Sequence, residues 1–494
     1  MQDSSRGSAS GGISPDGSAG AGVGGGGPLP DGVLLCIFRH LDLRTRFNTA
    51  ALVSSRWALL ATAAPELLHT VEARLAASAL PSVESFTRWL TSPAVAHHVR
   101  RLSVEVEGEE PAPTAEETAA ASLELGAAIV QLGTAVDGSG LLDLRISSEV
   151  PLDIAAACEM VAPSLLRCAV DVPTGSFVHA TDMSASPLRE LHIAAGVLEF
   201  APPALHASLP RGLERLALGG LVDGDAVLPQ KLAGLPRLRS LSLCNCALSA
   251  EGLAACLAAL PALQSLRLAS NDGLPSRACL AALSSRLTAL SLEPAKGSPA
   301  ADVGAALEAG LPQLTALRRL ALRVPHGAAE HRSMPAAVAR LPSLHSFAWL
   351  IGARAGSGRM LQRQLVGPLP QLPAGGWLSQ LTSLALPAGV AAASLAALAA
   401  ATQLQRLALD HFCALPADPQ SDLLSLAGRH PALRKLRLSL GSSGCALGTA
   451  AFVQAAAALA ANPRLSIAAE AAPLLPEEEW EEELFGPQPW AACL

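Results

Sequence analysis

The sequence contains no tyrosine and few aromatic or charged residues. Of its 494 residues, 3% are aromatic and 16% are charged, whereas about 25% are charged in an average soluble domain. Lysine occurs only at Lys231, Lys296 and Lys435, so nearly all of the positive charge is arginine. The formal net charge is −7, and a short acidic run from Glu477 to Glu483 accounts for most of it. This balance excludes a strongly basic nucleic-acid-binding chain, and we expect no nucleic-acid partner.

Targeting and membrane signals are also missing. The first 27 residues are mainly glycine and serine and lack the apolar core of a signal peptide. No run reaches the roughly 18 apolar residues that a membrane span needs, and no asparagine lies in a glycosylation sequon. These absences agree on a reducing compartment, and we expect a protein of the cytoplasm or nucleus without a membrane partner.

Residue groupings that carry chemistry are equally scarce. The ten cysteines include no Cys-x-x-Cys pair with zinc-binding spacing, and the twelve histidines are scattered along the chain. No histidine lies at a fixed offset from a serine, a cysteine or a pair of carboxylates. The glycines at 22–27 are followed by no Gly-Lys-Ser/Thr, so they form no phosphate-binding loop. We therefore expect no metal, no cofactor and no catalytic residue, in a protein that is not an enzyme.

What the sequence does contain is a leucine pattern, Leu-x-x-Leu-x-Leu, that recurs through most of its length. The clearest copies begin at Leu213, Leu238, Leu263, Leu287, Leu317, Leu381, Leu404 and Leu433. Between residues 144 and 290, the middle apolar residues of successive copies follow one another by 24, 23, 25, 25, 25 and 24 residues. This period is that of the leucine-rich repeat.

Each copy predicts a short strand with its leucines on one face, followed by a helix. In one copy, Ser249 can cap a helix over Ser249–Leu260, which Pro261 ends. Asn271 occupies a turn position, where it can satisfy backbone groups. One repeat alone leaves both flanks exposed, so the copies must stack. We predict an α/β fold, a horseshoe-shaped solenoid of about 13–14 leucine-rich repeats over residues 69–472, with its strands on the concave face.

The outward-facing strand position before the second leucine of each copy forms a predicted column along the concave face. Among its residues from Arg101 to Lys435, six are basic and two are acidic. Arginine can donate in a planar fork to a carboxylate or a phosphate. We predict that an acidic or phosphorylated segment of a protein target binds arginines of this column and the next, namely Arg215, Arg267, Arg319, Arg406 and Arg437. The alternative is that the arginine bias of the sequence leaves these side chains as solvated surface.

A separate motif precedes the repeats. Residues 29–57 open with Leu-Pro, continue with an Ile-x-x-x-Leu spacing and close with Val-Ser-x-x-Trp. Apolar residues recur there at helical spacing in two stripes, one around Ile37 and one around Val53. A segment this short exposes more apolar surface than it can bury alone, so it needs a partner or a neighbouring domain.

This motif resembles the F-box over essentially its whole length, although Gly32 stands where an acidic residue is common. The resemblance to F-box proteins with leucine-rich repeats implies a substrate receptor of an SCF-type (Skp–cullin–F-box) ubiquitin ligase. In that family the F-box docks on the Skp adaptor and the repeats hold the target, so a Skp-type adaptor, a cullin and an unknown protein substrate are the expected partners. Carried over to this sequence, the adaptor-binding residues are Leu29, Pro30, Leu34, Ile37, Phe38, Leu41, Leu43, Val53, Ser54 and Trp57.

Two other interpretations stay open. The motif can be a helical cap that only closes one end of the solenoid, and a cytoskeletal or ciliary repeat scaffold could carry it without a ligase role. We expect four parts: a disordered Gly/Ser-rich tail at 1–27, the F-box-like domain at 28–68, the solenoid at 69–472 and an acidic tail at 473–494. The acidic tail is either solubilising or a docking peptide for a basic partner.

Overall fold

The computed structural model describes residues 29–470, except for 42, 109–111, 135–139, 180–182, 201–208, 272–276, 295–299, 325–335, 352–370, 374, 411, 413–414 and 440–448. The predicted disordered tail at 1–27 and the predicted acidic tail at 473–494 therefore lie outside the described residues. The chain divides into two compact units, one ending at Leu67 and the other beginning at Leu68.

The first unit is helical. Its elements are α1 (Asp31–Arg39), α2 (Leu43–Thr45), the π-helical turn η1 (Arg46–Ala50), α3 (Ala51–Val53), α4 (Ser55–Ala63) and α5 (Pro65–Leu68), which leads into the second unit. The Ser54 hydroxyl accepts a hydrogen bond from the Trp57 amide at 3.1 Å, and so caps the start of α4. A serine in this position satisfies an amide that has no partner within the first helical turn.

The second unit alternates strands with helices. Its strands are β1 (Thr70–Ala76), β2 (Arg101–Glu107), β3 (Asp143–Ser148), β4 (Arg167–His179), β5 (Glu190–Phe200), β6 (Arg215–Leu221), β7 (Ser240–Cys244), β8 (Ser265–Asn271), β9 (Ala289–Pro294), β10 (Arg319–Val324), β11 (Ser346–Ile351), β12 (Ser383–Pro387), β13 (Arg406–Asp410), β14 (Lys435–Ser439) and β15 (Ser466–Glu470). Its helices are α6 (Leu80–Leu90), α7 (Pro93–Ala96), α8 (Ala115–Gly133), α9 (Ala155–Val161), α11 (Gly224–Leu232), α12 (Ala250–Ala258), α13 (Arg277–Ala281), α14 (Ala300–Gly310), α16 (Ala388–Ala393), α17 (Leu395–Ala400), α18 (Ala417–Arg429) and α19 (Thr449–Ala461), with the 3-10 turns η2 (Leu311–Gln313), η4 (Ala336–Arg340) and η5 (Gly376–Gln380).

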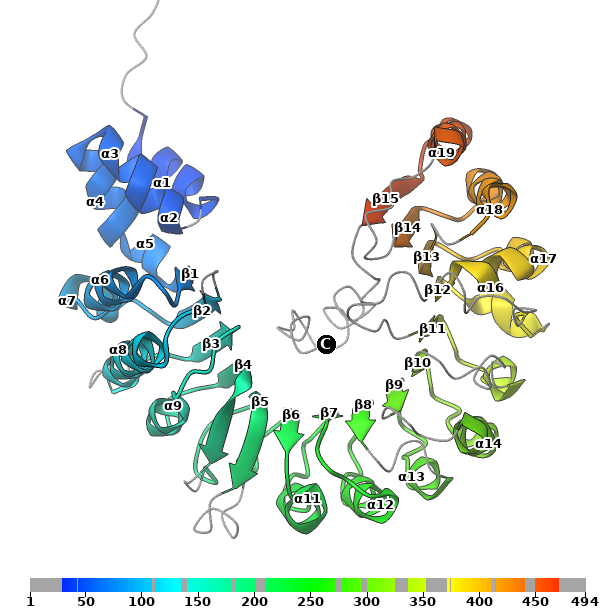
Figure 1. The fold of residues 1–494 in the computed structure, drawn as a ribbon, viewed down its shortest axis with the longest axis horizontal. Coiled ribbons are helices and arrows are strands. Elements are labelled where there is room, and N and C mark those ends of the chain that lie inside the picture. The colour runs from blue at the N-terminus through cyan, green and yellow to red at the C-terminus, as the bar shows by residue number, and fades with distance from the viewer. Residues whose placement is uncertain are drawn as a thin grey trace, which may run out of the picture. The chain divides into compact units, whose positions relative to one another are not determined.

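In the described part of the chain, fifteen parallel strands form one sheet in chain order. Within the second unit, Figure 1 shows the strands along the inner side and the helices along the outer side. The repeat leucines form the core between these layers: Leu216, Leu241 and Leu266 are in register on adjacent strands and are at most 1% exposed. The predicted leucine-rich-repeat solenoid is therefore confirmed, and its described residues contain fifteen strands rather than one for each of the 13–14 predicted repeats.

Two local predictions are also confirmed. Helix α12 begins after Ser249, whose hydroxyl accepts a hydrogen bond from the Gly252 amide at 3.1 Å. The buried Asn271 side chain accepts a hydrogen bond from the Cys246 amide (2.8 Å) and donates to the carbonyls of Leu243 and Ala269 (3.0 Å each). Asn271 thus joins one repeat to the preceding one by pairing backbone groups that would otherwise be buried without partners.

Among the described residues, no helix combines the length and hydrophobicity that a membrane-spanning segment requires.

A buried histidine in the sheet predicts how the second unit responds to acid. His192 on β5 is 7% exposed, and burial lowers its pKa to about 3, with the charges of Arg267 and Arg145 adding to the effect. The unfolded chain binds a proton near pH 6.5 and the folded chain does not, so stability is lost as the pH falls below 6.5. Between pH 7.5 and pH 5, we expect this histidine to lower the free energy of unfolding by about 2 kcal/mol.

Urea unfolding at the two pH values measures this loss. His192→Gln should remove most of it, whereas His345→Gln, which alters an exposed histidine, should leave it unchanged. Equal pH dependence in the parent and His192→Gln proteins would show that His192 is not responsible.

Candidate functional site

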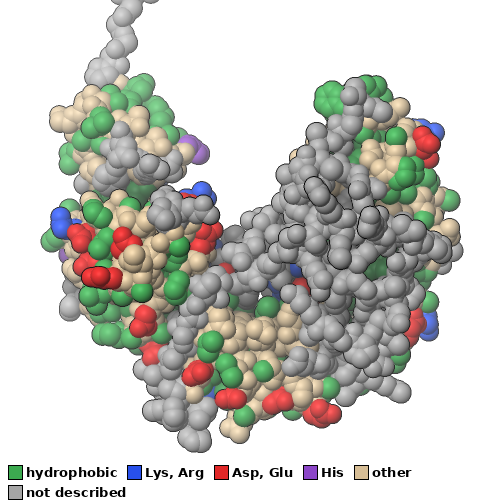
Figure 2. All heavy atoms as spheres, viewed as in Figure 1, with side chains coloured by type: hydrophobic (Ala, Val, Ile, Leu, Met, Phe, Trp, Pro, Cys, Tyr) green, Lys and Arg blue, Asp and Glu red, His purple; other side chains and the backbone are tan. Residues whose placement is uncertain are grey.

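The helical unit exposes large apolar side chains that a self-contained domain would bury. The exposed fractions are 45% for Leu29, 42% for Ile37 and 59% for Val53, and hydrophobic side chains are visible on this unit in Figure 2. Further exposed residues are Val33 at 44%, Leu52 at 80% and Leu59 at 67%. Exposed apolar side chains of this size are typical of protein-interaction sites.

Other predicted adaptor-binding residues occupy the interior of the unit. Leu34 and Phe38 are 0% exposed and pack in one cluster with Leu67 and other residues of the unit. The Phe38 ring lies edge-on to Trp57, with ring centroids 5.3 Å apart. Direct adaptor contact by Leu34 and Phe38 does not fit this burial, because successive turns of α1 direct them into the core. They hold in place the helix that exposes Ile37.

The remaining predicted residues lie at the edge of this core or on the surface. Leu41 and Trp57 are half-buried and pack against the cluster, and Leu43 is also half-buried. Pro30 and Ser54 are exposed and precede α1 and α4. Of the ten predicted residues, the surface ones with large apolar side chains are thus Leu29, Ile37 and Val53.

Four residues of this surface were missing from the ten predicted ones: Val33, Leu52, Leu59 and Arg56. Leu52 and Leu59 are exposed, and each belongs to an apolar pair, with Val53 and Leu60 respectively. Only the second pair divides between surface and core, with Leu60 packed against the helical core, whereas Leu52 and Val53 are both exposed. An adjacent apolar pair was therefore the available signal for Leu59. Arg56 donates to the Leu29 carbonyl and to Asp31 (2.8 Å each) and so fixes the chain at the start of α1.

The predicted concave column is present as one register of the sheet. The first residues of β2 to β14 lie side by side, in the order Arg101, Asp143, Arg167, Glu190, Arg215, Ser240, Ser265, Ala289, Arg319, Ser346, Ser383, Arg406 and Lys435. Arg215, Arg319 and Arg406 therefore share a column, as predicted, and Arg267 and Arg437 share the next one.

Over β3 to β6 this column is an alternating ladder of opposite charges. Arg167 lies 3.4 Å from an oxygen of Asp143 and 3.7 Å from one of Glu190, and Arg215 lies 3.6 Å from the same Glu190 carboxylate. Among the residues immediately before β5 and β6, Arg189 lies 3.9 Å from Glu214. The pairs of Glu190 and Glu214 are partly exposed, and such pairs stabilise weakly, by about 0–1 kcal/mol each, whereas Asp143 is buried. They do balance the local charge, which makes Arg215 a weaker candidate for binding an anionic target.

Over β10 to β14 the charge is of one sign. The first residues of these strands and the residues immediately before them include no Asp or Glu. They include five cationic side chains, which we call the basic edge: Arg318, Arg319, Arg406, Arg434 and Lys435.

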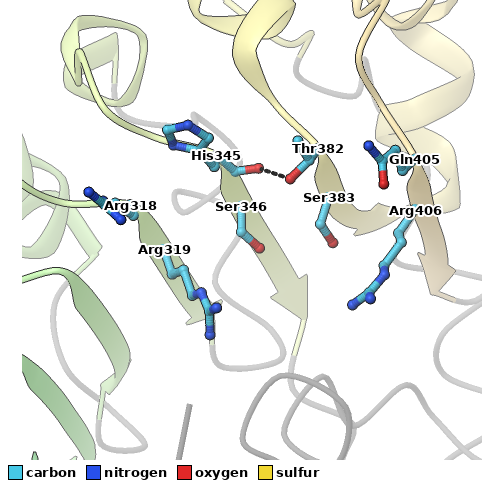
Figure 3. A pocket seen from close by; sticks show the side chains of 8 residues that line it. All are labelled: Arg318, Arg319, His345, Ser346, Thr382, Ser383, Gln405 and Arg406. Atoms are coloured by element: carbon cyan, nitrogen blue, oxygen red, sulfur yellow. Dashed lines mark hydrogen bonds between the residues drawn. The ribbon is translucent and has the colours of Figure 1, made fainter. Parts of the chain in front are cut away.

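A pocket of about 320 Å³ opens within the basic edge. Its lining residues are Arg318, Arg319, His345, Ser346, Thr382, Ser383, Gln405 and Arg406. Figure 3 shows Arg319 and Arg406 on either side of the two serines, which lie on adjacent strands between them. Small serines next to two arginines leave room for a bulky anionic group.

The backbone at this edge is already paired. The amides of Arg319, Ser383 and Arg406 donate to carbonyls of the preceding repeats, at 3.0, 3.2 and 3.0 Å. The Thr382 hydroxyl also donates to the His345 carbonyl at 3.1 Å. Recognition at the pocket must therefore come from side chains, chiefly the guanidinium groups, which can bind carboxylate or phosphate oxygens in pairs.

The second predicted column contributes less surface. Arg267 on β8 is only 4% exposed, so its direct contact with a target does not fit the structure. Its guanidinium charge instead contributes to the lowered pKa of His192. Arg437 on β14 is half-buried and lies between Ala408 and Ala468 in the register. Of the five predicted arginines, Arg319 and Arg406 are the two that the pocket brings together.

Family models match the helical unit and a part of the repeats. Residues 28–71 match the F-box-like family model. Residues 181–351 match a model for the leucine-rich repeats of an FBD-associated F-box protein. No curated protein sequence matches the chain. Among solved structures, the chain is similar to one from the Rad7 and Elc1 complex in yeast, with 12% identity, a TM-score of 0.31, and coverage of 88% of this chain and 92% of that one.

Proposed function

We propose that this chain, an F-box-like domain followed by a leucine-rich-repeat solenoid, is the substrate receptor of an SCF-type ubiquitin ligase in the cytoplasm or nucleus. The helical unit binds a Skp-type adaptor, which connects it to a cullin, and the basic edge binds the target protein. The chain itself carries out no reaction. It raises the concentration of the target around the ubiquitin-charged enzyme, which is how a non-catalytic receptor accelerates transfer.

One observation carries this proposal. Within the segment that matches the F-box-like model, Leu29, Ile37 and Val53 are exposed at positions that the F-box resemblance assigns to adaptor binding. Each of these apolar side chains costs free energy in water, and an adaptor surface would cover them. The repeats then provide a second, separate surface, the basic edge, for an acidic or phosphorylated segment of the target.

The proposal is tested by identifying the target and then measuring whether variants of the basic edge bind it more weakly. The full chain is isolated from cells in which cullin activity is blocked, and trapped partners are identified by mass spectrometry. Replacing Arg319 and Arg406 together with glutamine should then release the target and retain the adaptor. Charge-assisted hydrogen bonds contribute about 1.5–3 kcal/mol each, so we expect the affinity for the target to fall by about 100-fold or more.

A matched control removes the same charge from the other part of the column. Arg167→Gln with Arg215→Gln disrupts the balanced ladder and leaves the basic edge intact. We expect less than a threefold change in target binding. Equal losses in the two double variants would mean that only the net charge of the concave face matters, and the pocket would have no specific role.

A further inference from the structure

The basic edge and the acidic run Glu477–Glu483 belong to the same chain, and we propose that they bind each other. In this inference the chain's own C-terminal segment is the occupant of the pocket between Arg319 and Arg406. It competes there with an acidic or phosphorylated target and holds the receptor in an autoinhibited state. The competition rests on the function proposed above, whereas the intramolecular binding does not.

Charge complementarity is the first argument. The first residues of β10 to β14 and the residues immediately before them include five cationic side chains and no acidic one. The seven residues from Glu477 to Glu483 are six glutamates and one tryptophan, Trp480. Over β3 to β6, by contrast, Asp143 and Glu190 alternate with Arg167 and Arg215, so acidic and basic side chains balance there. An acidic peptide is therefore attracted to the basic edge more than to the ladder.

The spacing of the charges also agrees. Neighbouring strands lie about 4.8 Å apart, so the first residues of β10 and β13 are separated by three spacings, or about 14 Å. An extended chain advances about 3.4 Å per residue, so glutamates four residues apart are separated by about the same distance. Glu477 with Glu481, or Glu479 with Glu483, can thus face Arg319 and Arg406 when the segment crosses the strands.

The connecting chain is long enough. Strand β15 ends at Glu470, two strands from β13 and five strands from β10. With about 4.8 Å between strands and about 3.4 Å per residue along them, Arg406 lies about 20 Å away and Arg319 about 30 Å away. The residues from Glu470 to Glu477 can span up to about 24 Å, and those to Glu483 up to about 45 Å. A short tether also gives a high effective concentration, so weak contacts suffice for binding.

Zero-length carbodiimide cross-linking of the full chain tests the contact. This reagent joins a lysine amine to a carboxylate that it touches, and Lys435 is the lysine that lies in the basic edge. We expect a cross-link within one chain between Lys435 and the acidic run, which Lys435→Arg must abolish. The absence of this product, or its formation only between two chains, would overturn the intramolecular contact.

Competition is measured with a labelled synthetic peptide of residues 474–486, which needs neither adaptor nor target. We expect it to bind at least tenfold more tightly to a full chain whose six glutamates are replaced by glutamine than to the parent chain. Adding Arg319→Gln and Arg406→Gln to that variant should remove the binding, whereas adding Arg167→Gln and Arg215→Gln should not. Equal affinity for the parent and the glutamine variant would refute autoinhibition. Because no adaptor is present, this outcome is independent of whether the helical unit binds one.

Discussion

Replacing Ile37 and Val53 together with alanine is expected to abolish binding of the Skp-type adaptor while the chain stays folded. Both side chains are largely exposed, at 42% and 59%, so the substitution leaves no cavity in the helical unit. An interface anchor typically costs about 2 kcal/mol or more when it is truncated. The two losses together correspond to roughly a 1,000-fold weaker complex, which titration calorimetry or gel filtration with purified adaptor can measure.

The control removes apolar side chains elsewhere that are more exposed than Ile37 and Val53. Leu123 on α8 and Phe452 on α19 are 73% and 66% exposed and belong to the second unit. Their double replacement by alanine should leave adaptor binding unchanged. If the Ile37/Val53 variant bound normally, the exposed apolar surface of the helical unit would not be the docking site.

Replacing Phe38 with alanine is expected to unfold the helical unit and leave the repeats intact. Phe38 is 0% exposed and packs against Trp57 in a core of few residues. Truncating a buried phenylalanine costs about 3–5 kcal/mol, which is comparable to the whole stability of so small a unit. Hydrogen exchange should show loss of amide protection in α1 and α4, with protection in β6 to β8 unchanged.

A conservative variant separates packing from docking. Phe38→Leu keeps most of the buried volume, and such swaps usually cost less than about 1.5 kcal/mol. The helical unit should then stay protected and still bind the adaptor. Retention of adaptor binding by Phe38→Ala, with normal protection of α1, would contradict the role of Phe38 as a core residue.

The parts of the fold that local rules determine were predictable from the sequence. The Leu-x-x-Leu-x-Leu pattern fixes which strand positions face the core, and it therefore places Arg319 and Arg406 in one column even where the spacing between copies departs from 24 residues. Ser249 and Asn271 act on backbone groups close to them in the repeat frame, so their roles followed from residue type and position.

The accessibility of individual side chains was not predictable, because it depends on packing between elements. Helical spacing put Phe38 and Ile37 in one stripe, but the structure buries the first and exposes the second. The column prediction treated its arginines alike, whereas Glu190 neutralises Arg215 and Arg267 is buried. The pocket depends on Arg318 and His345, which precede the strands and therefore lay outside the predicted column.

Copurification of the full chain from cells, with quantification of the proteins bound to it, tests the central claim most directly. The substrate-receptor function predicts a Skp-type adaptor and a cullin in amounts comparable to the chain itself, and the loss of both with Ile37→Ala and Val53→Ala. A solenoid that recovers partners through its repeats, but neither adaptor nor cullin, would contradict the account and favour a repeat scaffold whose helical unit serves only as a cap.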